Sequence, residues 1–156
     1  MTGLRRLLLR LLSLPDGSVR AADQAAPADR HGPFVTVRIV TTVEIGQARR
    51  VFDGARETET IMQACLSTVS VQAFGTNAYA LMQKLRALLE SSAGMAGLRS
   101  LHCTVPSMTP VRNLTGVIGA GIEERANIDL TINHDHIVEI DQRHIAEAEV
   151  IVHTEH

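Results

Sequence analysis

The chain has 156 residues, a formal net charge of −2 and few aromatic side chains, with three Phe, one Tyr and no Trp. This length predicts one domain, which buries about two-thirds of the surface of its unfolded chain. The slightly acidic balance provides no basic footprint for nucleic acid, and the shortage of aromatics argues against single-strand stacking platforms and a sugar-binding cleft. No apolar run approaches the roughly 20 residues that a membrane-spanning helix needs.

The segment Leu4–Leu14 is basic and rich in leucine. Its leucines form a helical stripe, which predicts a short terminal helix that packs on its own domain or on a neighbouring subunit. Two other interpretations are a signal peptide, against which Arg10 interrupts the apolar run, and an amphipathic helix on a membrane surface. Residues Ser18–Gly32 are rich in Ala, Asp and Pro and have no period, so we expect an extended arm.

The next two elements are predicted as strands joined by a hairpin connection. Residues Pro33–Val43 alternate with the period of two that a pleated strand requires. Residues Glu44–Arg56 contain Gly46 and an Asp-Gly pair, which predicts a long loop. This loop carries three arginines, and a solvated loop tip is a simpler interpretation of them than nucleic-acid contact; they are Arg49, Arg50 and Arg56.

The segment Glu57–Leu89 is predicted to be the centre of the domain. A strand runs to Phe74, and Thr76 is the expected N-cap of a following helix because its hydroxyl can accept a first-turn N–H. The helix has one apolar stripe, which should pack back onto the sheet; it comprises Leu81, Met82, Leu85, Leu88 and Leu89.

The rest of the chain predicts a short helix, further strands and one long loop. Residues Gly94–Leu101 suggest the helix, and Pro106–Gly121 the loop, in which GVIGAG has no strand-to-helix context for a phosphate-binding site. Strands are expected at His102–Val105, Ile122–Ile132, His134–Ile140 and Ala146–His153. The order predicts an α+β fold with a mainly antiparallel sheet, a central amphipathic helix packed on one face, and an N-terminal helix and extended arm. The predicted organisation is residues 1–32 as helix and arm, and 33–156 as the α+β domain.

Catalytic and metal-binding signatures are largely missing from the sequence. His134 and His136 share a strand face and with a carboxylate could bind zinc, so a small metal-dependent enzyme is an alternative interpretation; His144, His153 and His156 follow without fixing a third ligand. Cys65 and Cys103 are too few for a disulfide framework and favour buried free thiols. We expect neither a cofactor nor a catalytic site.

The order of four segments resembles the neck or tail-terminator proteins of tailed bacteriophages. These are PFVTVRIV, TVSVQAFG with the leucine-striped helix after it, VRNLTG and ERANIDLTI, and the resemblance as a whole runs from about Pro33 to Ile140. The most specific are Val69–Gly75, where a strand ends in aromatic-Gly before a helix, and Glu124–Ile132. The histidine-rich tail beyond Asp141 lies outside the resemblance.

The resemblance implies a structural virion protein without catalytic residues, located in the neck and assembled in the host cytoplasm. Such subunits form a hexameric ring that caps the tail tube protein, docks the head–tail connector or stopper protein and lets double-stranded DNA pass non-specifically through its lumen, with no membrane involved. A head-completion or stopper protein, or a tube protein, is the alternative within the same machine. Candidate subunit-interface residues are Leu4, Leu7, Leu8, Leu11, Arg49, Arg50, Arg56, Pro110, Arg112 and Asn113. Candidate lumen residues are Glu123, Glu124, Glu139, Asp141, Glu147 and Glu149.

Overall fold

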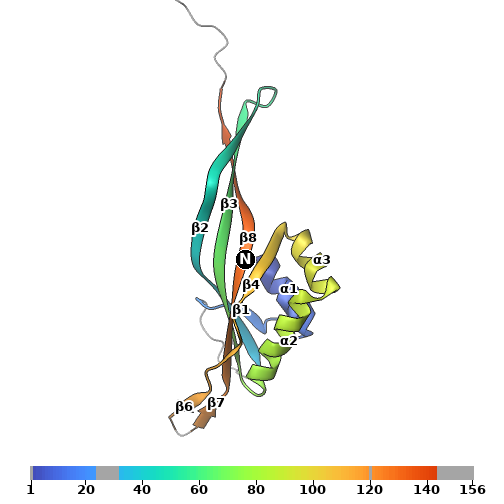
Figure 1. The fold of residues 1–156 in the computed structure, drawn as a ribbon, viewed down its shortest axis with the longest axis vertical. Helices are drawn as coiled ribbons and strands as arrows, with labels where there is room; N and C mark the ends of the chain where they lie inside the picture. Colours follow the sequence, from blue (N-terminus) through green and yellow to red (C-terminus); the bar gives the residue numbers. More distant parts are fainter. Residues whose placement is uncertain (1, 24–31, 120, 144–156) are drawn as a thin grey trace, which may run out of the picture.

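A computed structural model of the chain describes residues 2–23, 32–119 and 121–143 and shows an α+β fold (Figure 1). The helices are α1 (Thr2–Leu12), α2 (Ala78–Glu90) and α3 (Ser92–Ser100). The strands are β1 (Val19–Ala21), β2 (Phe34–Asp53), β3 (Thr58–Phe74), β4 (Cys103–Met108), β5 (Arg112–Asn113), β6 (Gly116–Ile118), β7 (Gly121–Glu123) and β8 (Arg125–Asp141). The mixed fold with a mainly antiparallel sheet confirms the predicted class.

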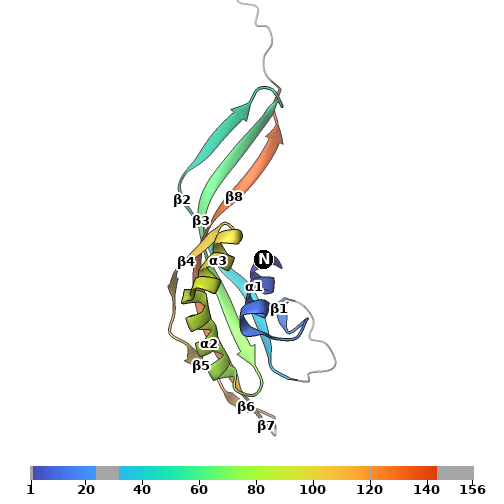
Figure 2. The same ribbon diagram turned by 90° about the vertical axis from the view of Figure 1, so that its right-hand side faces the viewer.

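The main sheet has six strands in the order β1-β2-β3-β8-β4, with β5 also paired to β8. Only the short pair β1–β2 is parallel among these described pairings. Strands β6 and β7 form a separate two-stranded hairpin. The three helices of the described residues lie against one side of the sheet, and none of them lies on the other side (Figures 1 and 2).

The central strand and helix match the sequence prediction. Along β3 the burial alternates, and Val69, Val71 and Ala73 are fully buried on the side that faces the helices. On α2 the predicted stripe faces the sheet, with Met82 and Leu85 fully buried. Burying such a side chain contributes about 1.5–3 kcal/mol relative to leaving it exposed, so this contact is a major source of stability.

Helix α1 packs on its own domain. The sequence had left open whether it packs there or on a neighbouring subunit. Leu4, Leu7, Leu8 and Leu12 are buried in the same core as the apolar residues of β3, β8 and α2. Residue Gly97 of α3 allows α1 to approach closely, because a Cβ there would lie 2.3 Å from a methyl carbon of Leu7.

The start of α2 differs from the prediction that Thr76 caps it. The N-cap is Asn77, which has a left-handed backbone (φ 64°) and makes no side-chain cap hydrogen bond. Its own N–H donates to Glu124 Oε2 at 2.7 Å, so a carboxylate from the neighbouring strand region occupies the helix N-terminus. The preceding Gly75 also has a positive φ, and its N–H donates to the Glu124 carbonyl.

Strand β2 is much longer than predicted and extends to Asp53. Residues 44–53 were expected to be a loop because Gly46 and several polar residues interrupt the alternation. In the structure these residues pair with β3, and irregularities at Ile39/Thr41 and Ile45/Arg49 absorb the extra residues. Arg49 and Arg50 therefore lie on a strand, and the actual turn is residues 54–57.

Three further segments differ from the sequence prediction. The strands expected at Ile122–Ile132 and His134–Ile140 join from Arg125 onward into one continuous strand, β8, because β3 is long enough to pair with its full length, whereas Ile122 and Glu123 belong to β7. The expected loop Pro106–Gly121 contains the end of β4 and the short strands β5 and β6. The start of the expected arm is a strand, since β1 pairs with residues 35–37 of β2. The strand expected at Ala146–His153 lies outside the described residues.

Candidate assembly surface

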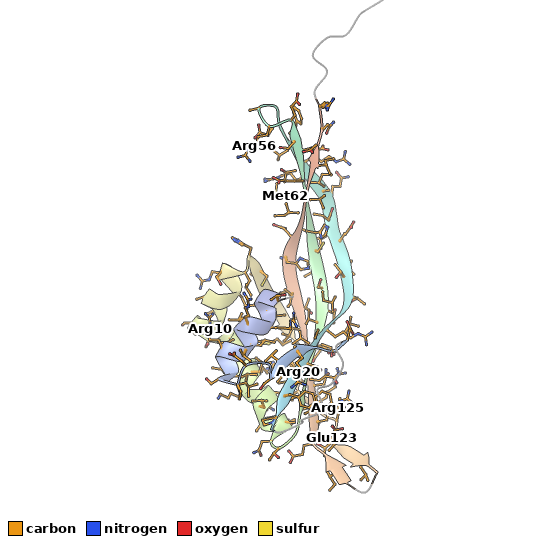
Figure 3. All side chains as sticks on the ribbon, turned by 180° about the vertical axis from the view of Figure 1, so that it is seen from behind. Arg10, Arg20, Arg56, Met62, Glu123 and Arg125 are labelled. Carbon is orange, nitrogen blue, oxygen red and sulfur yellow. The ribbon has the colours of Figure 1, made fainter. Side chains whose placement is uncertain are left out.

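Three strands continue together beyond the helical layer and form a long projection (Figures 1 and 2). It consists of residues 41–53 of β2, the turn 54–57, residues 58–66 of β3 and 133–141 of β8, and we call it the β-arm. Figure 3 shows Arg56 and Met62 on this projection, at the end of the molecule opposite to Glu123. No described helix covers either of its faces.

The β-arm exposes many large apolar side chains. Along β2 every residue from Arg38 to Asp53 is exposed, and in β8 every residue from Asp135 to Asp141. Val43 is 61% exposed and Ile137 is 59% exposed. The other large apolar side chains exposed here are Ile45, Val51, Phe52, Val138 and Ile140. A three-stranded sheet normally needs a buried apolar face, so this composition is typical of a surface that is covered on association.

Both edges of the β-arm are open within the described part of the chain. Strand β1 pairs only with residues 35–37 of β2, which leaves the backbone of β2 beyond Arg38 without a partner on its outer side. Strand β4 begins opposite His134, so residues 135–141 of β8 have no outer partner either. Unpaired edge strands present rows of N–H and C=O groups that can pair with another chain.

The helix-free face of the sheet carries a polar network near the body of the domain. Asn127 is only 2% exposed; its amide N–H donates to Ser70 Oγ at 2.7 Å, and its Oδ1 accepts from Arg112. Arg112 also forms an ion pair with Asp129. Because each of these polar groups has a partner, the network holds β3, β5 and β8 in one register.

An aromatic stack lies beside this network on the same face. The rings of Phe34 and Phe74 stack with centroids 4.8 Å apart. The Arg20 guanidinium lies over Phe34 at 5.4 Å and the Arg125 guanidinium over Phe74 at 5.0 Å. Arg125 also donates to Gln72 Oε1 at 3.1 Å. Two arginines are thus held against the sheet by cation–π and hydrogen-bond contacts.

The predicted interface residues divide into three groups in the structure. Leu4, Leu7 and Leu8 are buried in the subunit's own core, so they are not available to a neighbouring subunit, and Leu11 is only partly exposed. Pro110, Arg112 and Asn113 lie near β5 with exposed surface, although Arg112 is engaged by Asn127 and Asp129. Arg49, Arg50 and Arg56 lie on the exposed β-arm.

The predicted lumen carboxylates do not form one cluster. Glu123 ends β7 and Glu124 follows it, at one end of the molecule, whereas Glu139 and Asp141 belong to the last residues of β8, at the far end of the β-arm (Figures 1 and 3). At about 3.4 Å per residue of strand, Glu124 and Glu139 are about 50 Å apart. Glu124 also has a structural role at the start of α2. Glu147 and Glu149 lie outside the described residues.

The histidine and cysteine positions offer no metal-binding set in residues 2–23, 32–119 and 121–143, where no group of three or more His, Cys, Asp or Glu side chains converges. His134 Nε2 lies 2.8 Å from Ser67 Oγ and forms a hydrogen bond with it. Cys65 and Cys103 are free thiols, and burial raises the pKa of the Cys103 thiol. His144, His153 and His156 lie outside the described residues.

Sequence reasoning missed the two open edges and Asn127. The long alternating runs in residues 34–53 and 125–141 were a signal for long strands. Gly46 interrupts the first run, and Asn133 and His134 interrupt the second, so neither was predicted at its full length. Nothing in the sequence indicated that the Asn127 amide is buried, because an Asn in an alternating strand normally faces solvent.

A polar strand face, a projecting arm with open edges and a compact helical core are features of a protein that functions by assembly. A family model described as phage neck terminator protein matches residues 1–156, so the chain belongs to the phage neck terminator family. The resemblance stated from the sequence is confirmed. No curated protein gives a significant match.

One solved structure similar to this chain is the sheath/tube terminator of an extracellular contractile injection system, PVC, in its extended state, determined by cryo-EM. The sequence identity is 11%, the TM-score is 0.41, and the match covers 99% of this chain and 64% of that chain. The family assignment rests on the match of the family model to residues 1–156.

Membership of this family makes the protein a structural component of the phage tail neck with a terminator role. The family is one of structural phage proteins. Among the described helices, none combines the length and the apolar character required to cross a bilayer.

Proposed function

We propose that the protein closes into a hexameric ring that caps the tail tube and stops its polymerisation. The observation that carries this proposal is the β-arm, which has apolar side chains on both faces and an open strand at each edge. A surface of this kind is covered when subunits associate side by side. A ring requires two different contact surfaces on each subunit, and the two edges of the β-arm are different.

The ring also joins the tube to the head connector, and DNA passes through its lumen. In the ring the helix-free face points toward the axis, because the circumference grows with radius and the thicker helical layer fits best outside. The arginines of this face near the body of the domain are held by intramolecular contacts, which leaves them less free to grip phosphate. Arg38 lies on the same face and is exposed. A reconstruction with the helices facing the axis would contradict this arrangement.

The carboxylates proposed to rim the lumen are now Glu139 and Asp141, which share the helix-free face of the β-arm. Arg49 lies on the same face and offsets the charge of Glu139, so Asp141 supplies the uncompensated negative charge, which repels the DNA backbone and avoids the salt-dependent affinity that each bound phosphate would add. Glu123 and Glu124, at the other end of the molecule, are assigned no lumen role.

The test is the mass and shape of the purified full-length chain. Mass photometry should show a discrete particle of about 101 kDa, six times the 16.9 kDa subunit, and negative-stain images should show rings. Added to polymerising tail tube protein, the ring should shorten the tubes. A particle that stays monomeric at every concentration would overturn the proposal, and long tubes formed by this chain alone would identify it as a tube protein instead.

A further inference from the structure

We infer that neighbouring copies of the chain pair strand β8 of one β-arm with strand β2 of the next, in parallel orientation and with complementary charges. This inference rests on the proposed function, since it specifies how the ring closes. It follows from the direction of the strands, the register of the β-arm and the position of its charged side chains.

Strand direction determines the orientation of the seam. Strand β2 is antiparallel to β3, and β3 is antiparallel to β8, so the two outer strands of the β-arm run in the same direction. Rotation about an axis that runs along the β-arm keeps the direction of every strand. The β8 edge of one copy therefore meets the β2 edge of the next in a parallel pair, whereas a two-fold dimer would pair β2 with β2, or β8 with β8, in antiparallel orientation.

The register across the β-arm defines which residues lie level with each other. Met62 of β3 is opposite both Arg49 and Ile137, and Thr58 is opposite both Asp53 and Asp141. If copies paired without any shift, Asp53 of one copy would face Asp141 of the next, and like charges directly opposite each other are destabilising.

If β2 of one copy is moved by two residues along β8 of its neighbour, toward the C-terminal end of β8, every side chain stays on its own face and this repulsion is removed. On the helix-free face, Arg49 then lies opposite Glu139 of the neighbouring copy, and Asp53 opposite Arg143, which follows the end of β8. Ile45 lies opposite Ile137, so two exposed apolar side chains cover each other.

On the opposite face of the β-arm, the same shift places Glu44 opposite His136 of the neighbour. A shift of two residues in the other direction would set Asp53 against Glu139, again with like charges. Of these three registers, only the shift toward the end of β8 sets Arg49 opposite a carboxylate without also setting Asp53 opposite one, and it also buries an apolar pair.

Two charged residues of the seam, Arg49 and Glu139, have no ion-pair partner among the described residues, whereas Asp53 Oδ1 accepts the N–H groups of Ala55 and Arg56. Between described residues the ion pairs are Arg56–Asp53 and Arg112–Asp129, so neither Arg49 nor Glu139 belongs to one. Arg49 donates only a long contact to the Met62 sulfur at 3.6 Å. The Arg56–Asp53 contact is 3.9 Å long and solvent-exposed, so it does not prevent Asp53 from accepting a second cation.

Disulfide trapping in the full-length chain tests the seam. In a Cys103→Ser background, the variant Ile45→Cys/Ile137→Cys should form a ladder of covalent oligomers that ends at the size of the ring. The two positions cannot bridge within one chain, because β3 separates them by two strand spacings, about 9.6 Å, which exceeds the reach of a disulfide. Each single variant should stay unlinked, and so should the control Lys84→Cys/Ile137→Cys, since Lys84 is exposed on α2.

Charge reversal provides a second readout. Arg49→Glu and Glu139→Arg should each weaken the association by about two- to fivefold per seam at low salt, and the double variant should restore it. Rings that give no ladder and no charge rescue would overturn the seam and leave the proposed function standing. Dimers trapped by either single-cysteine variant would show a two-fold contact and overturn the parallel seam, whereas a chain that never leaves the monomeric state would overturn the proposed function itself.

Discussion

Because α2 and α3 are in close contact, we expect replacing Gly94 with Ala to change the stability in the direction opposite to that given by helix propensity. Gly94 lies inside α3, where replacing Gly with Ala normally stabilises a helix by about 1 kcal/mol. Here a Cβ would lie 2.1 Å from the Leu88 carbonyl oxygen and 2.8 Å from the Leu89 Cα. Both are backbone atoms, so no side-chain rotation relieves the clash, and the helices must move apart.

We therefore expect Gly94→Ala to destabilise the protein by about 2 kcal/mol, since overpacking typically costs 1–3 kcal/mol. For a chain of this length the thermal midpoint should fall by about 4–8 °C. Melting is followed by circular dichroism at one fixed protein concentration, because association changes the apparent stability. The control Ala96→Gly, at an exposed position of the same helix, should cost about 1 kcal/mol. A Gly94→Ala variant that melts higher than the wild type would refute the close-approach reasoning.

Three further outcomes are expected. Leu85→Asp should unfold the domain, because Leu85 is fully buried and an unpaired buried charge costs several kcal/mol; a soluble variant with a normal melt would contradict the core assignment. Asn127→Leu should lower the free energy of unfolding by about 1–3 kcal/mol, because Ser70 loses its donor and Arg112 keeps only Asp129; an unchanged urea midpoint would count against the network. The Cys103 thiol should react with iodoacetamide at pH 8 more slowly than the amino acid cysteine in solution, because burial raises its pKa and less thiolate is present. Equal rates would contradict this.

The central strand and helix could be predicted because both of their periods are strong. Strand β3 alternates over its buried half, and α2 has a continuous apolar stripe, so local pattern and tertiary packing agree. The prediction that Thr76 is the N-cap of α2 was wrong because the group that stabilises the helix N-terminus is distant in sequence. Glu124 supplies the acceptor for the Asn77 N–H, and a local rule about Thr76 could not anticipate it.

The β-arm could not be predicted from local sequence because its length depends on pairing between segments far apart in the chain. Gly46 has a positive φ within an irregular part of β2, where the sequence indicated the start of a loop. The second half of β8 was predicted as a separate strand, since Asn133 and His134 interrupt its apolar alternation. Both segments are strands because β3 lies between them along its full length.

The expected roles of the charged residues were partly changed by their positions. Arg49 was placed on a solvated loop and instead lies at an open strand edge. The lumen carboxylates were expected because of the resemblance and the slightly acidic composition, and the four that lie within the described residues are divided between two ends of the molecule. The predicted division of the chain at residue 32 stays a prediction, although α1 contributes to the same core as the strands.

A cryo-EM reconstruction of the assembled protein tests the central claim most directly. We expect a closed ring in which β8 of each β-arm lies beside and parallel to β2 of the next, with Arg49 next to Glu139 of the neighbouring copy. A particle in which the β-arms remain separate from one another, with both edges exposed to solvent, would contradict the account.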